Sequence, residues 1–392
     1  MKSKIDLRHE RSGLLPDLSG IKTPCYLLDL SALKSNGEII SEVAKESGGK
    51  ALLALKAFAA WPVFPEISKY YSGTCSSSLD ETRLGFEEFG GEVHAFSPAY
   101  KDCEIEEYIR MCSHLSFNSL SQWERHKRRI LDSEKKVSCG LRVNPEHCEV
   151  ETAIYNPCRP GSRLGIRAGE LENFDFEGIE GLHFHALCEN NADALERTLD
   201  AFEERFARYL DGMKWVNFGG GHHITRRDYD TGLLIDLIKE FRERWGCEVY
   251  IEPGEACALN AGWLISEVVD IKDNDGMIAI VDASATAHMP DVLEMPYRPY
   301  IVGSGKPGKK KYTFRLGGPS CLSGDDIGTY SFDCELKPGD KLAFTDMAHY
   351  TMVKNTTFNG IRLPDILLWD QEKDSIEVLR TFGYEDFKSR LG

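Results

Sequence analysis

The chain has 392 residues and a formal net charge of −16, with ordinary apolar and charged fractions for a globular protein. This length suffices for one large barrel domain and a second domain, or for two or three smaller domains. The negative charge argues against nonspecific binding to nucleic acid or anionic membranes, and it is compatible with a cationic substrate.

The N-terminus and the cysteines indicate a cytoplasmic protein. No apolar stretch follows the charged residues 1–10, so we expect no signal peptide, and no apolar run is long enough to cross a bilayer. The twelve cysteines are scattered singly, and none forms a C-x-x-C pair. We therefore expect free thiols in a reducing compartment, and neither disulfides nor a metal site.

From residue 23 to residue 254, apolar segments typical of strands alternate with amphipathic segments typical of helices. The predicted strands are 51–55, 93–96, 114–117, 137–143, 181–185, 215–218 and 249–251. The clearest predicted helices are 80–89, 192–209 and 232–244. Seven or eight βα units with short connections predict an α/β fold, a parallel (β/α)8 TIM-like barrel.

After residue 262 the pattern changes to strands joined by tight turns. The predicted strands are 263–271, 277–281, 311–316, 341–344 and 375–379, with turns such as 274–276 and 337–340. Because helical patterns are scarce here, we predict a separate β domain of sandwich or barrel type. It is expected to comprise 266–392 and 1–35, since the short strand at 25–28 precedes the barrel pattern. The barrel is predicted to span 36–265.

Lys56 ends an apolar predicted strand. A lysine amine attacks a carbonyl only in its neutral form, which apolar surroundings favour. Barrel active sites lie at the C-terminal ends of the strands, where we expect Lys56. A strand-end lysine that reaches solvent is the alternative, so Lys56 alone is a weak signal.

Gly219, Gly220 and Gly221 follow a predicted strand and precede a predicted helix. Glycines let backbone amides approach an anionic oxygen closely, as phosphate binding requires. The spacing is not G-x-G-x-x-G, which disfavours a dinucleotide site, and a plain tight turn is the alternative. The adjacent His222 and His223 lack a third ligand at helical spacing, so we predict no metal there.

Glu252 and His185 also end predicted strands. A carboxylate at Glu252 would suit a protonated pyridine nitrogen, because the ion pair keeps the ring cationic and electron-accepting. The His185 imidazole would suit stacking on a planar ring. A glutamate that caps a turn and a histidine in the core are the alternatives.

The segment 318–325 is bounded by glycine and places the Cys321 thiol four residues before Asp325. A loop cysteine near a carboxylate can donate a proton, although such a fragment is more often a turn. The segment 303–309 has P-loop spacing, but Lys310 replaces the Ser or Thr that would bind magnesium, and no helix follows. We therefore reject a P-loop.

Taken in order, six segments resemble one known family across nearly the whole chain. They are LALKAF (53–58), LHFHALCE (182–189), GGGHHIT (219–225), EPGEAC (252–257), MPYRPY (295–300) and GPSCLSGD (318–325). The chain resembles the alanine-racemase-like (fold type III) decarboxylases that use pyridoxal 5'-phosphate (PLP), a group that contains ornithine and diaminopimelate decarboxylases. Within that group it is most similar to the carboxynorspermidine decarboxylase branch.

The resemblance implies a PLP-binding barrel, a C-terminal β domain and a homodimer with shared active sites. By it, Lys56 binds the cofactor covalently, and Cys321 is a proton donor that enters from the partner subunit. The other implied roles are ring stacking by His185, phosphate binding by Gly219, Gly220, Gly221 and Tyr350, pairing of Glu252 with the pyridine nitrogen, and Asp325 near the substrate tail.

One position departs from many basic-amino-acid decarboxylases of this family. Their Glu-Pro-Gly is followed by an arginine that contacts the phosphate, whereas this chain has Glu255. Because phosphate would repel a carboxylate, we predict that Glu255 faces a cationic group. Asp291 lies in a segment expected to meet the substrate amine, although a solvated loop acid is the alternative. Two added carboxylates favour a triamine-like substrate.

The predicted reaction removes CO2 from carboxynorspermidine or carboxyspermidine and gives norspermidine or spermidine. The first alternative keeps PLP but acts on ornithine, lysine, arginine or diaminopimelate, or racemises its substrate; Glu255 argues against it. The second is a noncatalytic PLP-binding protein, which would need neither the Cys321 segment nor a full β domain.

Overall fold

The computed structural model describes residues 15–150 and 152–392, and it divides into two compact units. The barrel unit is Lys34–Cys257, and the β unit comprises Ala258–Gly392 together with the described residues up to Leu33. The barrel unit therefore ends at Cys257, whereas we predicted 265. The reason is that β10 (Gly262–Asp273) pairs from its first residue with strands of the β unit. Residues 1–14, which we assigned to the β domain, lie outside the described residues.

Within the described residues of the barrel unit, parallel strands close into a barrel in sequence order, as predicted. They are β2 (Lys50–Ala54), β3 (Gly73–Ser76), β4 (Glu92–Ser97), β5 (His114–Phe117), β6 (Ser138–Arg142), β7 (Ile179–His183), β8 (Trp215–Asn217) and β9 (Glu248–Ile251). The barrel closes because β2 pairs with β3 on one side and with β9 on the other.

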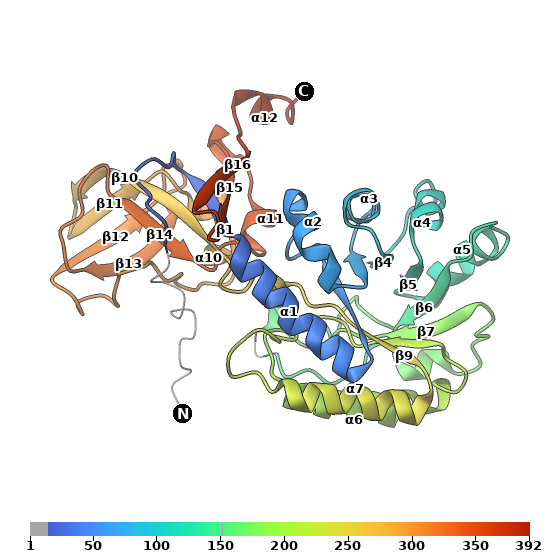
Figure 1. Cartoon of the computed structure of the whole chain (residues 1–392). Helices are drawn as coiled ribbons and strands as arrows, with labels where there is room; N and C mark the ends of the chain where they lie inside the picture. Colours follow the sequence, from blue (N-terminus) through green and yellow to red (C-terminus); the bar gives the residue numbers. More distant parts are fainter. Residues whose placement is uncertain (1–14, 151) are drawn as a thin grey trace. The chain divides into compact units, whose positions relative to one another are not determined.

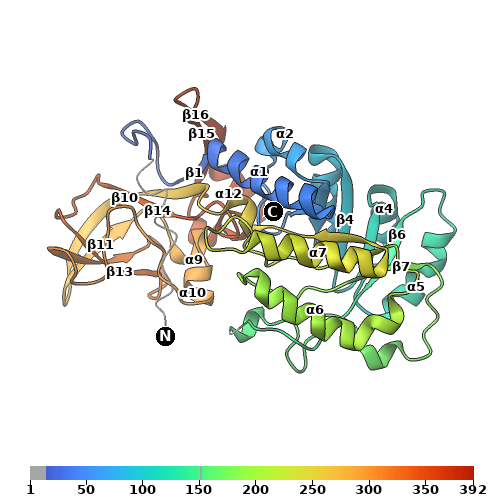
Figure 2. The same cartoon turned by 60° about the horizontal axis from the view of Figure 1, so that its bottom comes forward.

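Helix α1 leads into β2, the other helices of this unit come after barrel strands, and α6 and α7 lie side by side (Figures 1 and 2). They are α1 (Leu30–Ser47), α2 (Phe64–Ile67), α3 (Leu79–Leu84), α4 (Ile105–Met111), α5 (Leu120–Leu131), α6 (Ala192–Phe206), α7 (Thr231–Trp245) and α8 (Glu255–Ala258). Side chains of Ser78, Ser119 and Asp230 cap α3, α5 and α7 by accepting backbone N–H groups of the first turn. Apolar residues of α6 at helical spacing, such as Leu195, Leu199 and Phe202, are buried in the core.

The prediction missed β3, and its composition explains why. The strand reads Gly-Thr-Cys-Ser, and every one of these residues is buried. Apolar periodicity finds a strand by its large hydrophobic side chains. Here the parallel neighbours β2 and β4 flank the strand and bury its small residues. The sequence of the strand therefore lacks the large apolar side chains by which a buried strand is recognised.

The described residues of the β unit form a sheet with the order β13-β12-β11-β10-β1-β15-β16, in which β14 also pairs with β10. Besides β10, its strands are β1 (Cys25–Asp29), β11 (Met277–Val281), β12 (Tyr312–Gly317), β13 (Asp326–Phe332), β14 (Lys341–Thr345), β15 (Asp365–Asp370) and β16 (Ser375–Arg380). β1 pairs with β10 and β15, so the first strand belongs to this unit, as predicted. We did not predict β13 and β15.

Short helices accompany these strands: α9 (Ala285–His288) and α10 (Asp291–Glu294) lie between β11 and β12, α11 (Thr351–Lys354) lies between β14 and β15, and α12 (Tyr384–Lys388) follows β16. A buried cluster that includes Cys25, Leu27, Trp263 and Ile265 forms a core on the sheet. Among the helices of residues 15–150 and 152–392, none combines the length and the apolar character that a membrane span needs.

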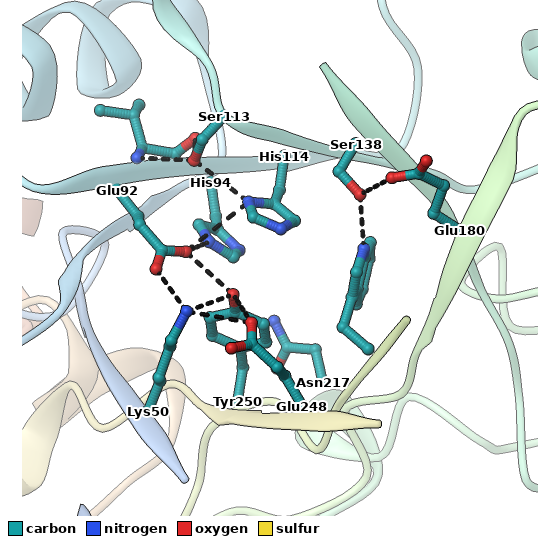
Figure 3. A network of polar contacts seen from close by, with 12 residues as sticks. Lys50, Glu92, His94, Ser113, His114, Ser138, Glu180, Asn217, Glu248 and Tyr250 are labelled. Carbon is teal, nitrogen blue, oxygen red and sulfur yellow. Dashed lines mark hydrogen bonds and ion pairs between the residues drawn. The ribbon is translucent and has the colours of Figure 1, made fainter. Parts of the chain in front are cut away.

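A polar network occupies the end of the barrel at which the strands begin (Figure 3). Lys50 Nζ donates to Glu92 Oε1 at 2.8 Å, to Glu248 Oε2 at 3.0 Å and to the Tyr250 hydroxyl at 3.2 Å. The Tyr250 oxygen lies 2.9 Å from Oε2 of both glutamates. His94 Nε2 lies 3.0 Å from Glu92 Oε2. One ammonium group thus joins β2, β4 and β9.

The geometry of this network argues against a metal site. Glu92, His94 and His114 offer ligand atoms within 4.8 Å of one another. However, the two imidazole rings are stacked, with centroids 3.9 Å apart and an interplanar angle of 16°. One ion cannot lie close to the planes of both rings, and Lys50 already balances the charge of Glu92. We assign the network a structural role.

We expect Lys50→Met to lower the free energy of unfolding by roughly 1–3 kcal/mol, because two carboxylates lose their shared hydrogen-bonded cation. Urea denaturation at neutral pH measures this loss. Lys136→Met, at an exposed lysine of the same unit, is the control and should change stability little. Equal losses in both variants would contradict the structural role.

The same network predicts the direction of a pH effect. Burial opposes ionisation of Glu92, but hydrogen bonds from His94 and Lys50 outweigh burial and lower the pKa of its carboxyl to about 2. The stabilisation is therefore fully present above the ordinary carboxyl pKa and is lost as the pH falls towards 2. Glu92→Gln should accordingly flatten this acid-induced loss of stability.

Candidate active site

A cavity lies at the end of the barrel where the strands finish, opposite the Lys50 network. Lys56 follows β2, Glu252 follows β9 directly, and His185 follows β7. The lining residues are Lys56, Cys75, Ser76, Ser77, Phe96, Arg142, His183, His185 and Glu252. The closure of the barrel thus brings the predicted strand-end residues to one place, as barrel active sites require.

Lys56 projects from a backbone that is held on both sides. The Leu55 N–H donates to the Cys75 carbonyl at 3.0 Å, and the Ala54 N–H donates to the Pro253 carbonyl at 3.1 Å. The neighbours Leu55 and Ala57 are fully buried, whereas Lys56 is half-buried and lines the cavity. The amine is therefore presented to the cavity from a rigid strand end.

Glu252 is a buried carboxylate with a polar surrounding. Its Oε1 accepts a hydrogen bond from Asn217 Nδ2 at 2.8 Å and lies 3.7 Å from His183 Nε2. Burial opposes ionisation, but His183, Lys56 and Asn217 outweigh burial, so the pKa of Glu252 lies below its ordinary value. The cavity therefore contains a carboxylate that is ready to pair with a cationic ring nitrogen.

The glycine loop is packed against the ends of β7 and β9. Gly219 and Gly221 have φ values of 71° and 90°, in the left-handed region that glycine favours. A Cβ atom at Gly219 would lie 2.4 Å from the Phe184 carbonyl oxygen, and one at Gly221 would lie 2.1 Å from that of Leu187. A side chain at either position would therefore force the loop apart.

Two of the loop amides already have partners in the protein. The Gly219 N–H donates to Asn217 Oδ1 and the Gly220 N–H donates to His185 Nδ1, each at 2.8 Å. Burial, Lys56 and Arg142 keep the pKa of His185 well below its ordinary value. The loop therefore orients a neutral imidazole. The Gly219 and Gly220 amides are thus engaged within the protein.

Sequence reasoning missed Arg142 and Glu81. The Arg142 guanidinium is buried, lies 4.3 Å from the centroid of the Phe96 ring and donates to the His185 carbonyl at 3.5 Å. Burial lowers its pKa to about 10, so it remains a cation. Arg142 is the last residue of β6, just as Lys56 ends an apolar predicted strand. This pattern of an apolar strand that ends in a basic residue could have identified Arg142.

Glu81 gives no comparable signal, because it lies within a helix. Its Oε2 accepts the Ser77 N–H at 2.6 Å. Burial raises the pKa of Glu81, while that hydrogen bond and the charge of Lys56 oppose the rise. Only the folded chain shows that this carboxyl lies close enough to Lys56 to feel its charge.

These groups fit PLP. The cofactor needs an amine for its aldehyde, an acid for its pyridine nitrogen, a flat group for its ring and donors for its phosphate. Lys56, Glu252, His185 and the glycine loop provide them. In addition, neither ring nitrogen of the buried His183 has a hydrogen-bond partner among residues 15–150 and 152–392, so the cavity has polar atoms left for a ligand.

Glu255 begins α8 and has a cationic neighbour within the protein. Its Oε2 lies 3.2 Å from His223 Nε2, and both side chains are largely buried. Burial opposes protonation of His223, but the charge and hydrogen bond of Glu255 outweigh it and raise the pKa of His223. His223, rejected above as a metal ligand, is thus an ionic partner of Glu255.

The other predicted residues, Asp291, Cys321, Asp325 and Tyr350, lie in the β unit. Cys321 is exposed, and Asp325, in the same loop, is buried. Asp291 begins α10 and forms an ion pair with Lys354. Tyr350 precedes α11 with φ 42° and ψ −58°, a backbone conformation that is rare for a residue with a side chain. The structure brings Lys56, His185, Glu252 and the glycine loop together.

Comparison with known proteins gives consistent matches. A family model described as "Pyridoxal-dependent decarboxylase, C-terminal sheet domain" matches residues 25–348. The "Carboxynorspermidine/carboxyspermidine decarboxylase" of Campylobacter jejuni is 44% identical and is matched over 94% of this chain and 98% of its own length. The "Carboxyaminopropylagmatine decarboxylase" of a Synechocystis strain is also 44% identical, over 96% of this chain and 97% of its own length.

Solved structures agree. The carboxynorspermidine decarboxylase of Campylobacter jejuni, complexed with norspermidine, superposes with a TM-score of 0.88 at 44% identity, and it covers 94% of this chain and 100% of its own. Diaminopimelate decarboxylase of Helicobacter pylori, complexed with L-lysine, has a TM-score of 0.78 at 21% identity over 95% of this chain and 97% of its own, which shows the shared fold. The chain therefore belongs to the pyridoxal-dependent decarboxylases with a PLP-binding barrel and a C-terminal sheet domain.

Proposed function

We propose that this PLP-dependent decarboxylase removes CO2 from carboxynorspermidine or carboxyspermidine and releases norspermidine or spermidine. The observation that carries the substrate assignment is Glu255, a half-buried carboxylate three residues beyond Glu252. A buried carboxylate selects for a cationic group, and a substrate cation would share Glu255 with His223, its ionic partner within the protein. The identity of 44% with a decarboxylase named for these two compounds supports the same choice.

When bound, PLP supplies an electron-accepting ring for the charge left on the substrate carbon as CO2 departs. Lys56 would hold the cofactor through its amine. Glu252 would keep the ring nitrogen protonated, since this carboxylate is ionised and fixed by Asn217. His185, neutral and oriented by the Gly220 amide, would lie against the ring. Arg142 would keep the cavity attractive to anionic groups.

Cys321 would then deliver a proton to the substrate carbon, and we propose that it comes from the partner subunit of a homodimer. The exposed surface near this thiol supports the dimer. The Cys321 N–H donates to Asn359 Oδ1 at 2.8 Å. Leu322, which follows Cys321, is 43% exposed, and Phe358, which precedes Asn359, is 45% exposed. Exposed apolar side chains beside a catalytic group are typical of a surface that a partner covers.

The remaining assignments are part of the same proposal. Tyr350 would contact the cofactor phosphate, and its unusual backbone fits a residue held for function. Asp291 would approach the substrate amine, in competition with Lys354. We place the enzyme in the cytoplasm, in polyamine biosynthesis, and the free thiols support a reducing compartment.

A second substrate deserves a direct test because the Synechocystis relative is equally identical to this chain. Its named substrate, carboxyaminopropylagmatine, ends in a guanidinium group, which forms two parallel hydrogen bonds with a carboxylate. Comparing kcat/KM for carboxyaminopropylagmatine, carboxynorspermidine and carboxyspermidine on the purified enzyme separates the two. Diaminopimelate decarboxylases match at only 23–28% identity, so diaminopimelate is less well supported as the substrate than these compounds.

We expect borohydride to fix the cofactor on Lys56, because this lysine lies at the end of β2 and lines the cavity. The purified enzyme should absorb visible light before reduction, and peptide mapping should find the label on the peptide that contains Lys56. Lys56→Ala should take up no label. A label on any other lysine would refute the assignment.

We expect mixtures of Lys56→Ala and Cys321→Ala subunits, each strongly impaired alone, to regain activity, because some heterodimers would contain one complete site. Mass spectrometry of differently tagged subunits verifies that the subunits exchange. Exchange without recovery of activity would show that the active site is not shared.

We expect Glu255→Gln to raise KM for the carboxy-polyamine by about one to two powers of ten, because it removes a charge-assisted contact of roughly 1.5–3 kcal/mol. The PLP content should stay nearly unchanged. Asp291→Asn should act in the same direction but more weakly, because Lys354 already engages that carboxylate. Glu243→Gln, on the exposed surface of α7, is the matched control.

If Glu255→Gln lost PLP and kept its KM, Glu255 would belong to the cofactor site. Steady-state kinetics together with cofactor quantification on the same preparation distinguish these outcomes.

A further inference from the structure

The loop that carries Cys321 closes on itself at Asp325. The Gly318 N–H donates to the Asp325 carbonyl at 2.9 Å, and the Asp325 N–H donates to the Leu322 carbonyl at 3.0 Å. Residues 321–324 are all exposed, whereas Asp325 is only 5% exposed. The loop therefore displays its tip to the outside and keeps one carboxylate inside.

Both oxygens of this carboxylate have donors in the β unit. Oδ2 accepts from Ser284 Oγ at 2.8 Å and from the Ser320 N–H at 3.2 Å. Oδ1 accepts the Thr286 N–H at 3.2 Å. Hydrogen bonds to an ionised carboxylate are stronger than those between neutral groups. Asp325 thus joins the residue before Cys321 to the start of α9.

Ser284 is itself fixed. Its hydroxyl donates to Asp325 and accepts the Ala287 N–H at 3.1 Å, as the N-cap of α9. The space for the carboxylate is also built into the loop, since a Cβ atom at Gly318 would lie 2.4 Å from Asp325 Oδ2. The buried carboxylate of Asp325 is therefore held by the first turn of α9 and the Ser284 hydroxyl, and Gly318 leaves room for it.

A second side chain, that of Asn359, also holds the backbone at Cys321. Asn359 Oδ1 accepts the Cys321 N–H at 2.8 Å. Asn359 has φ 57° and ψ 13°, in the left-handed region that asparagine tolerates better than most residues. The backbone at Cys321 is thus fixed at its own amide by Asn359 and one residue earlier by Asp325.

We propose that Asp325 is a positioning residue that holds the Cys321 loop in the conformation needed for proton delivery, and that it does not bind the substrate tail. The proposal rests on the proposed role of Cys321 as the proton donor. A substrate cation would have to displace donors from both oxygens of a carboxylate that is nearly inaccessible. Proton transfer, by contrast, requires the thiol to lie within hydrogen-bond distance of the substrate carbon that receives the proton. A loop fixed in one conformation keeps the thiol at that position.

Asp325→Asn tests the role, because the amide keeps the volume but turns one acceptor into a donor that faces other donors. We expect kcat to fall by roughly ten- to a hundredfold and KM to change by less than about twofold. Asp326→Asn is the matched control, since its carboxylate is the next along the chain and lies outside these contacts. A large rise in KM with kcat preserved would overturn the proposal in favour of a substrate contact.

A double-mutant cycle separates positioning from general damage. In the Cys321→Ala background, Asp325→Asn should lower kcat by less than about twofold further, because the group that it positions is absent. Independent, additive losses would overturn the proposal. If Asp325→Asn does not fold, Ser284→Ala removes only one donor and should give a smaller kcat loss that also disappears without Cys321.

Hydrogen–deuterium exchange of the purified enzyme provides a readout that does not depend on activity. Asp325→Asn should speed exchange in residues 318–325 and leave exchange in the barrel unit unchanged. Unaltered exchange in residues 318–325 would overturn the proposal. If Cys321→Ala keeps the wild-type kcat, the proposed proton donor is wrong, and that result stands apart from the exchange result for Asp325.

Discussion

The candidate active site depends on the pairing of β2 with β9, the contact that closes the barrel. Lys50 pairs with Tyr250 and Ala51 with Ile251, and the ladder continues to the site through the hydrogen bond between the Ala54 amide and the Pro253 carbonyl. Lys56 and Glu252 follow directly from this pairing, although they are far apart in the sequence. A parallel barrel can place an amine and a carboxylate on one rim only if its first and last strands are in the correct register.

The interior of the barrel has two polar ends with different tasks. Between them, the apolar layer inside the barrel is thin and consists of Leu52, Ala54, Cys75, Trp215 and Tyr250. The large hydrophobic cluster instead comprises strand residues such as Leu115 and Leu182 packed with helix residues such as Phe202 and Ile238. The large apolar cluster therefore lies between the strands and the helices, and the inside of the barrel is left for ion pairs at one end and the cavity residues at the other.

The sequence could predict features that depend only on residues close together in the chain. An apolar run that ends in a polar residue identified the strand ends at Lys56, His185 and Glu252. The same pattern fits Arg142, which we overlooked. It could not identify β3, whose small residues carry no hydrophobic signal.

Features that depend on contacts between distant segments were beyond that reasoning. The partner of Glu255 proved to be His223, and that of Asp291 proved to be Lys354. The surroundings of Asp325 depend on Ser284 and Thr286, which lie in another segment of the β unit. A carboxylate in a loop reads the same in the sequence whether it faces a substrate, a lysine or its own backbone.

The ion-pair network around Lys50 has a consequence for how such an enzyme can change over time. It lies at the opposite end of the strands from Lys56, so substitutions that strengthen or weaken it alter the margin of stability without touching the chemistry. Substitutions that adapt the cavity to a new substrate usually destabilise a protein. A reserve of stability held at a separate end of the barrel would let the lineage tolerate those substitutions and explore new substrates.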